Sequence, residues 1–245
     1  MDSFQLAEKY PALFHVSKAS WQTLLSSGLR STSALVSDCQ SETNEVLVSR
    51  DEGFSYSTES TESILSAHRP NDWLVKHPSD ATIQVKLRNQ RPLSTRRLVT
   101  LLTDGMEPQQ WIRLLNSYVF LFPEDPTKKP FVAYEKGEQT VLVLDTKKLL
   151  QSVGNHFWNR WSFSEINLGA TIHDAKERGR SSIKEPCVHN AAKSIKEVLV
   201  NSEIPRHAVI SSLKEVFKIR DGDGKSGISS SLLKTYLDPF KTLQI

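Results

Sequence analysis

The chain has 245 residues, of which 38% are hydrophobic and 24% charged, and its formal net charge is +3. This length allows one large domain with a hydrophobic core, and no apolar run approaches the roughly 18–20 residues that a membrane span needs. The N-terminal stretch MDSFQLAEKYP is not a signal peptide, because it carries acidic residues and no apolar core. Two cysteines do not make a disulfide framework, so we expect a cytoplasmic protein without a membrane partner.

The charge is distributed unevenly along the chain. Residues 1–67 hold four Lys/Arg against nine Asp/Glu, whereas residues 68–100 hold seven Lys/Arg against two Asp. A basic segment of this density suits a phosphate-bearing partner, because binding releases counterions from the phosphates. We therefore predict contacts with nucleic acid, DNA rather than RNA, from Lys86, Arg88, Arg96 and Arg97. A solvated helix face would account for the same charges.

The first elements follow from apolar spacing and capping residues. Residues 4–14 predict a short helix and then an apolar run that ends at His15. Apolar residues at helical spacing predict a helix over 20–27, with Ser17 or Ser20 as its N-cap and a glycine just after its end.

The middle of the chain contains one polar stretch and then a series of short elements. Residues 37–63 are rich in Ser, Thr, Glu and Asp, which predicts a long mobile loop or an insertion. Alternation predicts a strand over 81–86, and a helix follows Ser94. A second helix starts at Pro108 and is followed by a buried strand over 118–122.

The last part of the chain predicts a strand over 140–146 followed by a helix, an aromatic strand over 158–167, and two further helices between 191 and 219. Short strands mixed with helices, without regular βαβ alternation, indicate an α+β fold with small mixed or antiparallel sheets, flanking helices and a helical C-terminal part. We expect a single catalytic domain over 1–220 and a tail over 221–245.

No metal site is expected. The stretch DGDGKSGIS at 221–229 lacks the ligand set of a calcium loop, because positions 5, 6 and 12 of that loop are Lys225, Ser226 and Leu232. Cys187 and His189 lack the paired spacing of a zinc site. Nucleotide hydrolases and dinucleotide dehydrogenases are also unsupported, because no P-loop, GxGxxG, GxSxG or HExxH occurs.

Aromatic residues concentrate in HFWNRWSF at 156–163. Trp158 and Trp161 could stack a base or a nicotinamide ring, and core packing would account for both as well.

The next stretch, SEINLG at 164–169, offers polar side chains at alternate positions. In an extended segment Glu165, Asn167 and Thr171 share one face, which predicts a polar cluster for a sugar or a phosphate. A surface edge strand would carry the same residues.

Several motifs in order resemble an uncharacterised bacterial domain family over roughly residues 10–220. They are the aromatic-His start with GL and STSAL, then HRP, NQ-PLS, DG-x-P-x-QW, LLN-x-x-VF and IN-x-G-x-T. Family members usually have Pro before Ile-Asn, where this chain has Glu165. A role for this carboxylate would therefore be specific to this chain.

The start of the chain, LFHVSKASWQTLLSSGL, is also similar to the start of ADP-ribosyltransferase-like folds, including DarT-type toxins that modify DNA. This resemblance implies an enzyme that acts at a ribosyl or deoxyribosyl C1′–N bond, with NAD as a substrate and a nucleic-acid target. It implies catalytic roles for His15, Glu165 and Asn167. The substrate-binding residues that we expect are Ser17, Arg69, Gln90, Arg91, Asn116, Trp158, Trp161 and Thr171.

Two alternatives remain at this stage. One is a DNA glycosylase that excises a modified base in anti-phage defence and needs no cofactor, since cleavage at C1′ passes through the same oxocarbenium-like state. The other is a non-catalytic module that only binds a nucleotide.

Overall fold

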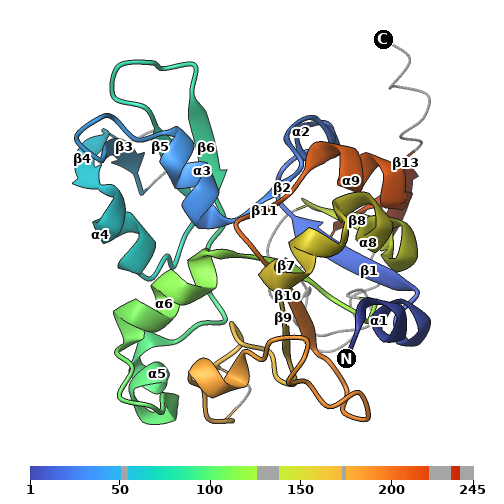
Figure 1. Ribbon diagram of the computed structural model, residues 1–245. Coiled ribbons are helices and arrows are strands. Elements are labelled where there is room, and N and C mark those ends of the chain that lie inside the picture. The colour runs from blue at the N-terminus through green and yellow to red at the C-terminus, as the bar shows by residue number, and fades with distance from the viewer. Residues whose placement is uncertain (51–54, 126–137, 173–174, 221–232, 238–245) are drawn as a thin grey trace.

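The computed structural model describes residues 1–50, 55–125, 138–172, 175–220 and 233–237. These residues form a mixed α+β fold with small sheets, and each strand pair within a sheet is antiparallel, as predicted (Figure 1). No helix in these ranges has the length and hydropathy that a membrane crossing requires.

The main body is built on two sheets. The first has the strand order β1-β8-β12-β13, with β1 (Ala12–Ser17), β8 (Glu138–Asp145), β12 (Leu213–Arg220) and β13 (Leu233–Leu237). The second has the order β7-β10-β9, with β7 (Tyr118–Leu121), β10 (Glu197–Asn201) and β9 (Trp161–Ser164). The sheets meet where Phe14 in β1 and Phe122 after β7 exchange two backbone hydrogen bonds of 2.9 and 2.8 Å. This junction places His15 beside β7.

Short helices flank these sheets: α1 (Ser3–Lys9), α2 (Trp21–Ser27), α8 (Thr146–Val153) and α9 (Arg206–Ser212), with 3-10 turns η2 (Asn155–Arg160) and η3 (Arg180–Ser182). Ser20 caps α2 by accepting from the Thr23 amide, and Gly28 ends it at φ +77°, both as the sequence predicts. A Cβ at Gly28 would lie 2.5 Å from the Ile204 carbonyl oxygen. Glycine is therefore needed where β2 (Leu29–Arg30) pairs with β11 (Glu203–Ile204).

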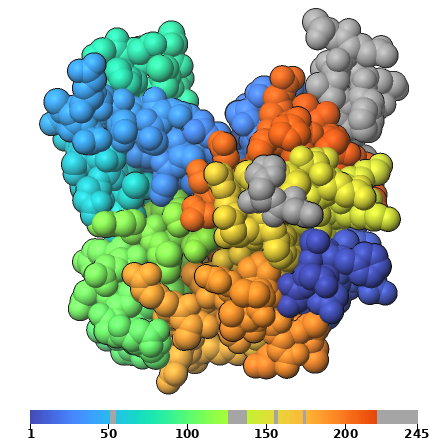
Figure 2. Space-filling view, viewed as in Figure 1, coloured from blue at the N-terminus to red at the C-terminus, as the bar shows by residue number. Residues whose placement is uncertain are grey.

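The small lobe comprises residues 32–87 and lies at the upper left of Figure 1. Its sheet has the order β4-β3-β5-β6, and its elements are α3 (Thr32–Asp38), β3 (Glu45–Ser49), β4 (Ser57–Ser60), α4 (Thr61–Ser66), β5 (Trp73–Lys76) and β6 (Gln84–Leu87). It has a hydrophobic core of its own, which includes Val46, Ile64 and Trp73. The surface is hollowed between this lobe and the main body (Figure 2).

Of the predicted loop or insertion over 37–63, the long loop is wrong, because the described part of this segment contains β3, β4 and the first half of α4. The few apolar residues there are sufficient, since Val46 and Val48 are buried in a lobe that needs only a small core. Residues 51–54 lie outside the described part.

Two helices, α5 (Thr95–Leu101) and α6 (Pro108–Asn116), lie below the small lobe (Figure 1). The caps predicted from the sequence are present, with the Ser94 hydroxyl accepting from the Arg97 amide and Pro108 at the first turn of α6. Their apolar faces share a core with Leu168 and Leu199 of the main body.

The prediction of a helical C-terminal part is wrong. Residues 197–201 and 213–220 are strands β10 and β12, and only α9 is helical between them. The apolar run at Val198–Val200 is buried between β7 and β9, and such a run cannot be distinguished from a buried helix by periodicity alone. The predicted tail contains β13, and the calcium-like stretch at 221–229 lies outside the described residues.

Candidate functional site

A polar seam lies where the loops that leave the small lobe reach β1, β7 and α6. Its members are His15, Ser17, Lys18, Arg69, Asp72, Arg88, Asn89, Gln90, Asn116 and Gln139. Their side chains form groups that hydrogen bonds hold together: Lys18 with Asp72 and Asn89, Arg69 with Gln90 and Asn116, and Arg88 with Gln139. His15 and Ser17 bond to backbone atoms beside these groups.

His15 is the titratable ring of this seam. Its Nδ1 lies 3.0 Å from the carbonyl oxygen of Phe120 in β7. Desolvation by burial, together with repulsion from Arg88, lowers the pKa of His15 to about 4, while the hydrogen bond to Phe120 opposes this shift. The ring is therefore neutral at neutral pH. Because Nδ1 must carry the proton that the carbonyl accepts, Nε2 keeps its lone pair and can accept a hydrogen bond.

Arg88 connects β1 and β8 to the loop that follows β6. Its guanidinium donates to the Val16 carbonyl oxygen at 3.3 Å and to Gln139 Oε1 at 3.2 Å, so it holds the backbone of β1 and a side chain of β8. We predicted that Arg88 contacts nucleic acid, and in the structure this side chain is directed into the seam. Lys86, from the same prediction, lies at the edge of the seam with Nζ 3.7 Å from Asp72.

Arg69 is buried, with 3% of its surface exposed. Its Nε donates to the Arg88 carbonyl oxygen and one terminal nitrogen donates to Asn116 Oδ1, both at 3.1 Å. The other terminal nitrogen has no hydrogen-bond partner among the described residues. Desolvation lowers the pKa of Arg69 to about 10, so the side chain stays charged. Arg69 therefore positions the loops around it, in contrast to the expected direct contact with a phosphate.

The remaining predicted residues of this region support the same loops. Gln90 accepts from the Arg69 amide at 3.1 Å and donates to Asn116 Oδ1 at 3.3 Å, and Asn116 donates to the Leu65 carbonyl oxygen at 2.8 Å. Ser17 Oγ accepts from the Ala19 amide at 3.0 Å.

Asp72 is the carboxylate of the seam, and sequence reasoning missed it. It accepts from the backbone and side-chain nitrogens of Asn89 at 2.9 and 2.8 Å and from Lys18 Nζ at 3.1 Å. Desolvation raises its pKa, but the hydrogen bonds from Asn89 and Lys18 outweigh this and lower it overall. The only hint in the sequence was proximity to predicted site residues. Asp72, Lys18 and Asn89 lie within three residues of Arg69, Ser17 and Gln90.

The structure places Glu165 elsewhere, in a group that we call the Glu165 cluster: Glu165, Lys184, His189 and Lys193. The carboxylate lies 2.8 Å from Lys184 Nζ, 3.3 Å from Lys193 Nζ and 3.7 Å from His189 Nδ1. The hydrogen bond from Lys184 is the largest cause that lowers the pKa of Glu165. Glu165 follows β9, which is three strands from β1 across β7 and β10, on the order of 14 Å at ordinary strand spacing.

Asn167 and Thr171 belong to a loop beside the Glu165 cluster, so they do not join His15. Thr171 is buried and its hydroxyl accepts from the Ser94 amide at 2.6 Å. The fully buried Arg178 donates to four backbone carbonyl oxygens of this region, those of Asn167, Leu168, Ala170 and Lys176. The segment is therefore a compact loop, and the predicted extended face of alternate polar side chains is not formed.

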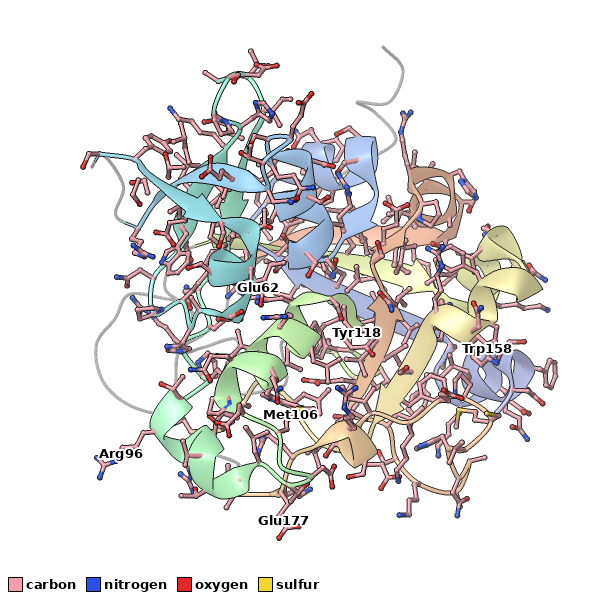
Figure 3. The ribbon with its side chains drawn as sticks, turned by 60° about the vertical axis from the view of Figure 1, so that its left-hand side comes forward. Glu62, Arg96, Met106, Tyr118, Trp158 and Glu177 are labelled. Carbon is pink, nitrogen blue, oxygen red and sulfur yellow. The ribbon has the colours of Figure 1, made fainter. Side chains whose placement is uncertain are left out.

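The two tryptophans also lie away from the seam. Trp161 is fully buried in the core of the main body, and Trp158 packs against it with ring centroids 5.6 Å apart. Figure 3 shows Trp158 on the side of the molecule opposite Arg96. Core packing, the alternative that we weighed, therefore accounts for Trp161.

Three predicted arginines lie on the surface. Arg91 donates to the Pro70 carbonyl oxygen at 3.3 Å at the border of the seam, and Arg97 donates to the Ile172 carbonyl oxygen at 2.8 Å. Arg96 is exposed at the outer edge of α5 and points away from the main body (Figure 3). Within the described ranges, no three His, Cys, Asp or Glu side chains gather in a way that could hold a metal ion.

Comparison with known proteins gives one match. A family model described as a family of unknown function (DUF7002) matches residues 11–210, which include every member of the polar seam. No curated protein and no solved structure matches the chain.

Proposed function

The chain belongs to this family of unknown function, and we propose that it is an enzyme of the ADP-ribosyltransferase type, which breaks the C1′–N bond between ribose and nicotinamide in NAD, releases nicotinamide and transfers the ADP-ribosyl group to a nucleic acid. The proposal rests on the similarity of the start of the chain to ADP-ribosyltransferase-like folds and on the chemistry of the polar seam. The observation that carries the proposal is that His15 is neutral and that its tautomer is fixed by a hydrogen bond.

A neutral His15 with Nδ1 held by Phe120 offers Nε2 as an acceptor of fixed direction. Within the described residues Nε2 has no hydrogen-bond partner. A ribose hydroxyl is a suitable donor to such an atom, and a protonated imidazole could not accept from it. We therefore assign to His15 the binding and orientation of a ribose of NAD.

Cleavage at C1′ develops positive charge on the ribose, and an ionised carboxylate stabilises this charge. We assign this role to Asp72, because its lowered pKa keeps it charged and its hydrogen bond from Lys18, the residue after β1, places it beside the strand that carries His15. Glu165 is less suitable, because it follows β9 and lies outside the seam.

The cations around the seam suit the charged parts of the substrates. Arg91 and Lys86 are both exposed, and they border the seam through contacts to the Pro70 carbonyl oxygen and to Asp72. We assign to them the pyrophosphate of NAD or the backbone of the acceptor, and to Arg69, Gln90 and Asn116 the positioning of the loops that carry these groups.

The two alternatives use the same seam differently. A DNA glycosylase would place a deoxyribose beside His15 and Asp72 and would act without NAD. A binding module would hold a nucleotide there without turnover, and the engagement of Asp72 by Lys18 and Asn89 is the observation that favours it.

One experiment distinguishes the transferase, the glycosylase and the binding module. The protein is incubated with single-stranded and double-stranded DNA carrying normal or modified bases, with and without NAD, and small molecules and DNA are analysed by mass. We expect nicotinamide release and DNA heavier by one ADP-ribosyl group. Abasic sites without NAD would establish the glycosylase, and binding without any product would establish the module; either result overturns the proposal.

The matched variants are His15→Gln and His207→Gln. His207 is an exposed histidine on α9 whose ring also contacts a backbone carbonyl oxygen, that of Ser152 at 3.3 Å. Loss of one hydrogen bond to substrate predicts nicotinamide release slower by about 10- to 100-fold for His15→Gln. We expect no change for His207→Gln, and equal rates in the two variants would remove His15 from the site.

A further inference from the structure

A cavity lies outside the seam, between α4, α5 and α6. Its volume is about 440 Å³, within the usual range for small-molecule sites. Its lining residues are Ser66, Ala67, His68, Thr95, Arg96, Val99, Pro108, Gln109 and Ile112. No assignment made above uses this cavity.

The cavity has an apolar wall and a polar edge. Val99, Pro108 and Ile112 form the wall, and Val99 is 68% exposed although it is a large hydrophobic residue. Thr95 and Gln109 are exposed, and their side chains have no hydrogen-bond partner within the described residues. A ligand that presents a flat apolar face and hydrogen-bonding edges fits such a cavity.

His68 adds an imidazole ring to the cavity. Its Nε2 donates to the Gln90 carbonyl oxygen at 3.1 Å, which fixes the ring in the wall of the cavity. Imidazole and guanidinium groups both stack on nucleobases in single-stranded nucleic acids. His68 and Arg96 therefore give this cavity two groups suited to a base.

The charge at the cavity favours an anion. None of its lining residues is acidic, Arg96 stands at its rim, and nearby Glu62 is paired with Arg113. The view in Figure 3 shows Arg96 projecting from α5 toward solvent, where a phosphate could reach it. A nucleobase inside the cavity would carry its phosphate to this rim.

We propose that the cavity between α4, α5 and α6 binds one nucleotide of a single-stranded nucleic acid, with the base against Val99 and His68 and the phosphate on Arg96. This deepens the proposed function and rests on its nucleic-acid target. His68 lines the cavity and the next residue, Arg69, belongs to the polar seam, so one loop contributes to both regions. We assign to the cavity the binding of the acceptor strand.

The test is equilibrium binding of a fluorescein-labelled 12-nucleotide single-stranded DNA, its RNA counterpart and a labelled acidic peptide, all without NAD. Arg96→Ala is compared with Lys147→Ala, because each removes one exposed cation from the second residue of a helix. We expect Arg96→Ala to weaken binding of the DNA or RNA about 10-fold and to reduce the salt slope by about 1. Lys147→Ala should change the affinity for the oligonucleotides by less than about 2-fold.

Val99 provides a second pair of variants at one exposed position. Val99→Glu should weaken binding about 10-fold, and Val99→Lys should preserve or tighten it, because only the first repels a phosphate. Four outcomes would each overturn the proposal. They are equal weakening by Val99→Glu and Val99→Lys, no effect of Arg96→Ala and Val99→Glu, no binding of either oligonucleotide, and preferential binding of the acidic peptide. Because the assay contains no NAD, its outcome is independent of whether the protein cleaves NAD.

Discussion

The polar seam and the Glu165 cluster both combine a histidine, a carboxylate and cations, but they satisfy these groups in different ways. In the seam Arg69 and Arg88 bond to backbone carbonyl oxygens and amide side chains, and His15 Nδ1 bonds to the Phe120 carbonyl oxygen. In the Glu165 cluster the lysines bond to the carboxylate itself, and the buried ring nitrogens of His189 have no hydrogen-bond partner among the described residues. The comparison teaches that the two groups differ in what their cations hold: the arginines of the seam fix the backbone of loops and of β1, whereas the lysines of the cluster pair with a side chain.

The largest effect on stability is expected from Arg69→Met. The substitution leaves the Arg88 carbonyl oxygen without this donor and leaves Asn116 Oδ1 with Gln90 as its remaining donor, which predicts a loss of about 3 kcal/mol in the free energy of unfolding. Urea denaturation followed by tryptophan fluorescence measures it. The exposed Arg91→Met is the control, with a change within about 0.5 kcal/mol. Similar losses in both variants would show that Arg69 does not hold the seam.

The next prediction sets the two carboxylates against each other in the nicotinamide-release assay. We expect Asp72→Asn to slow release by about 100-fold, because it removes the charge that stabilises the ribosyl cation. Glu165→Gln should change the rate by less than about 2-fold, because Glu165 follows β9 and lies too far from His15 for its charge to act at the same site. Thermal unfolding of both variants serves as the control for folding. The opposite ranking would return the catalytic role to Glu165, as the sequence predicted.

The pH dependence of stability distinguishes His15 from an exposed histidine. The pKa of His15 falls from 6.5 to about 4 on folding, so the unfolded chain binds more protons between these values. The free energy of unfolding therefore decreases as pH is lowered from 6.5 to 4, and His15 contributes about 1–3 kcal/mol of this decrease.

Urea titrations at several pH values measure this effect. The pKa of His189 is also lowered, mainly by desolvation, so His189 adds a dependence of the same sign. His15→Gln should flatten the curve, and His15→Gln with His189→Gln should flatten it further. An unchanged curve for His15→Gln would show that the ring titrates normally.

The smallest effect is expected for the ion pair between Lys184 and Glu165, whose side chains are 31% and 26% exposed. Lys184→Met should lower the free energy of unfolding by less than about 1 kcal/mol, because solvent screens the pair and Lys193 remains. The same urea titration measures it, and a loss above about 2 kcal/mol would make this cluster a principal support of the fold.

Local signals in the sequence were sufficient for elements that are specified by their own residues. Helix α2 begins after Ser20 and ends at Gly28, α5 is capped by Ser94, and α6 starts at Pro108. These boundaries were predictable because capping and turn preferences act within a few residues. The small lobe was missed because its core is small and its exposed positions are polar. Strand β10 was missed because a short buried apolar run fits a helix equally well.

The candidate site was predictable in part for the same reason. The resemblance implied one site from a larger set of residues, of which His15, Ser17, Arg69, Gln90 and Asn116 lie in the seam, whereas Glu165, Asn167 and the tryptophans do not. The family match over 11–210 agrees with the extent of the resemblance. The sequence by itself also determined the local caps, the mixed α+β composition and the basic segment at 68–100.

Only the tertiary structure decided which of these groups are available. It buried Arg69 among carbonyl oxygens, placed Asp72 in the seam and moved Glu165 three strands away from His15. The physical reason is that burial and hydrogen-bond partners come from segments far apart in the chain. Phe120, which fixes the tautomer of His15, is 105 residues away in sequence, and no local pattern contains that contact.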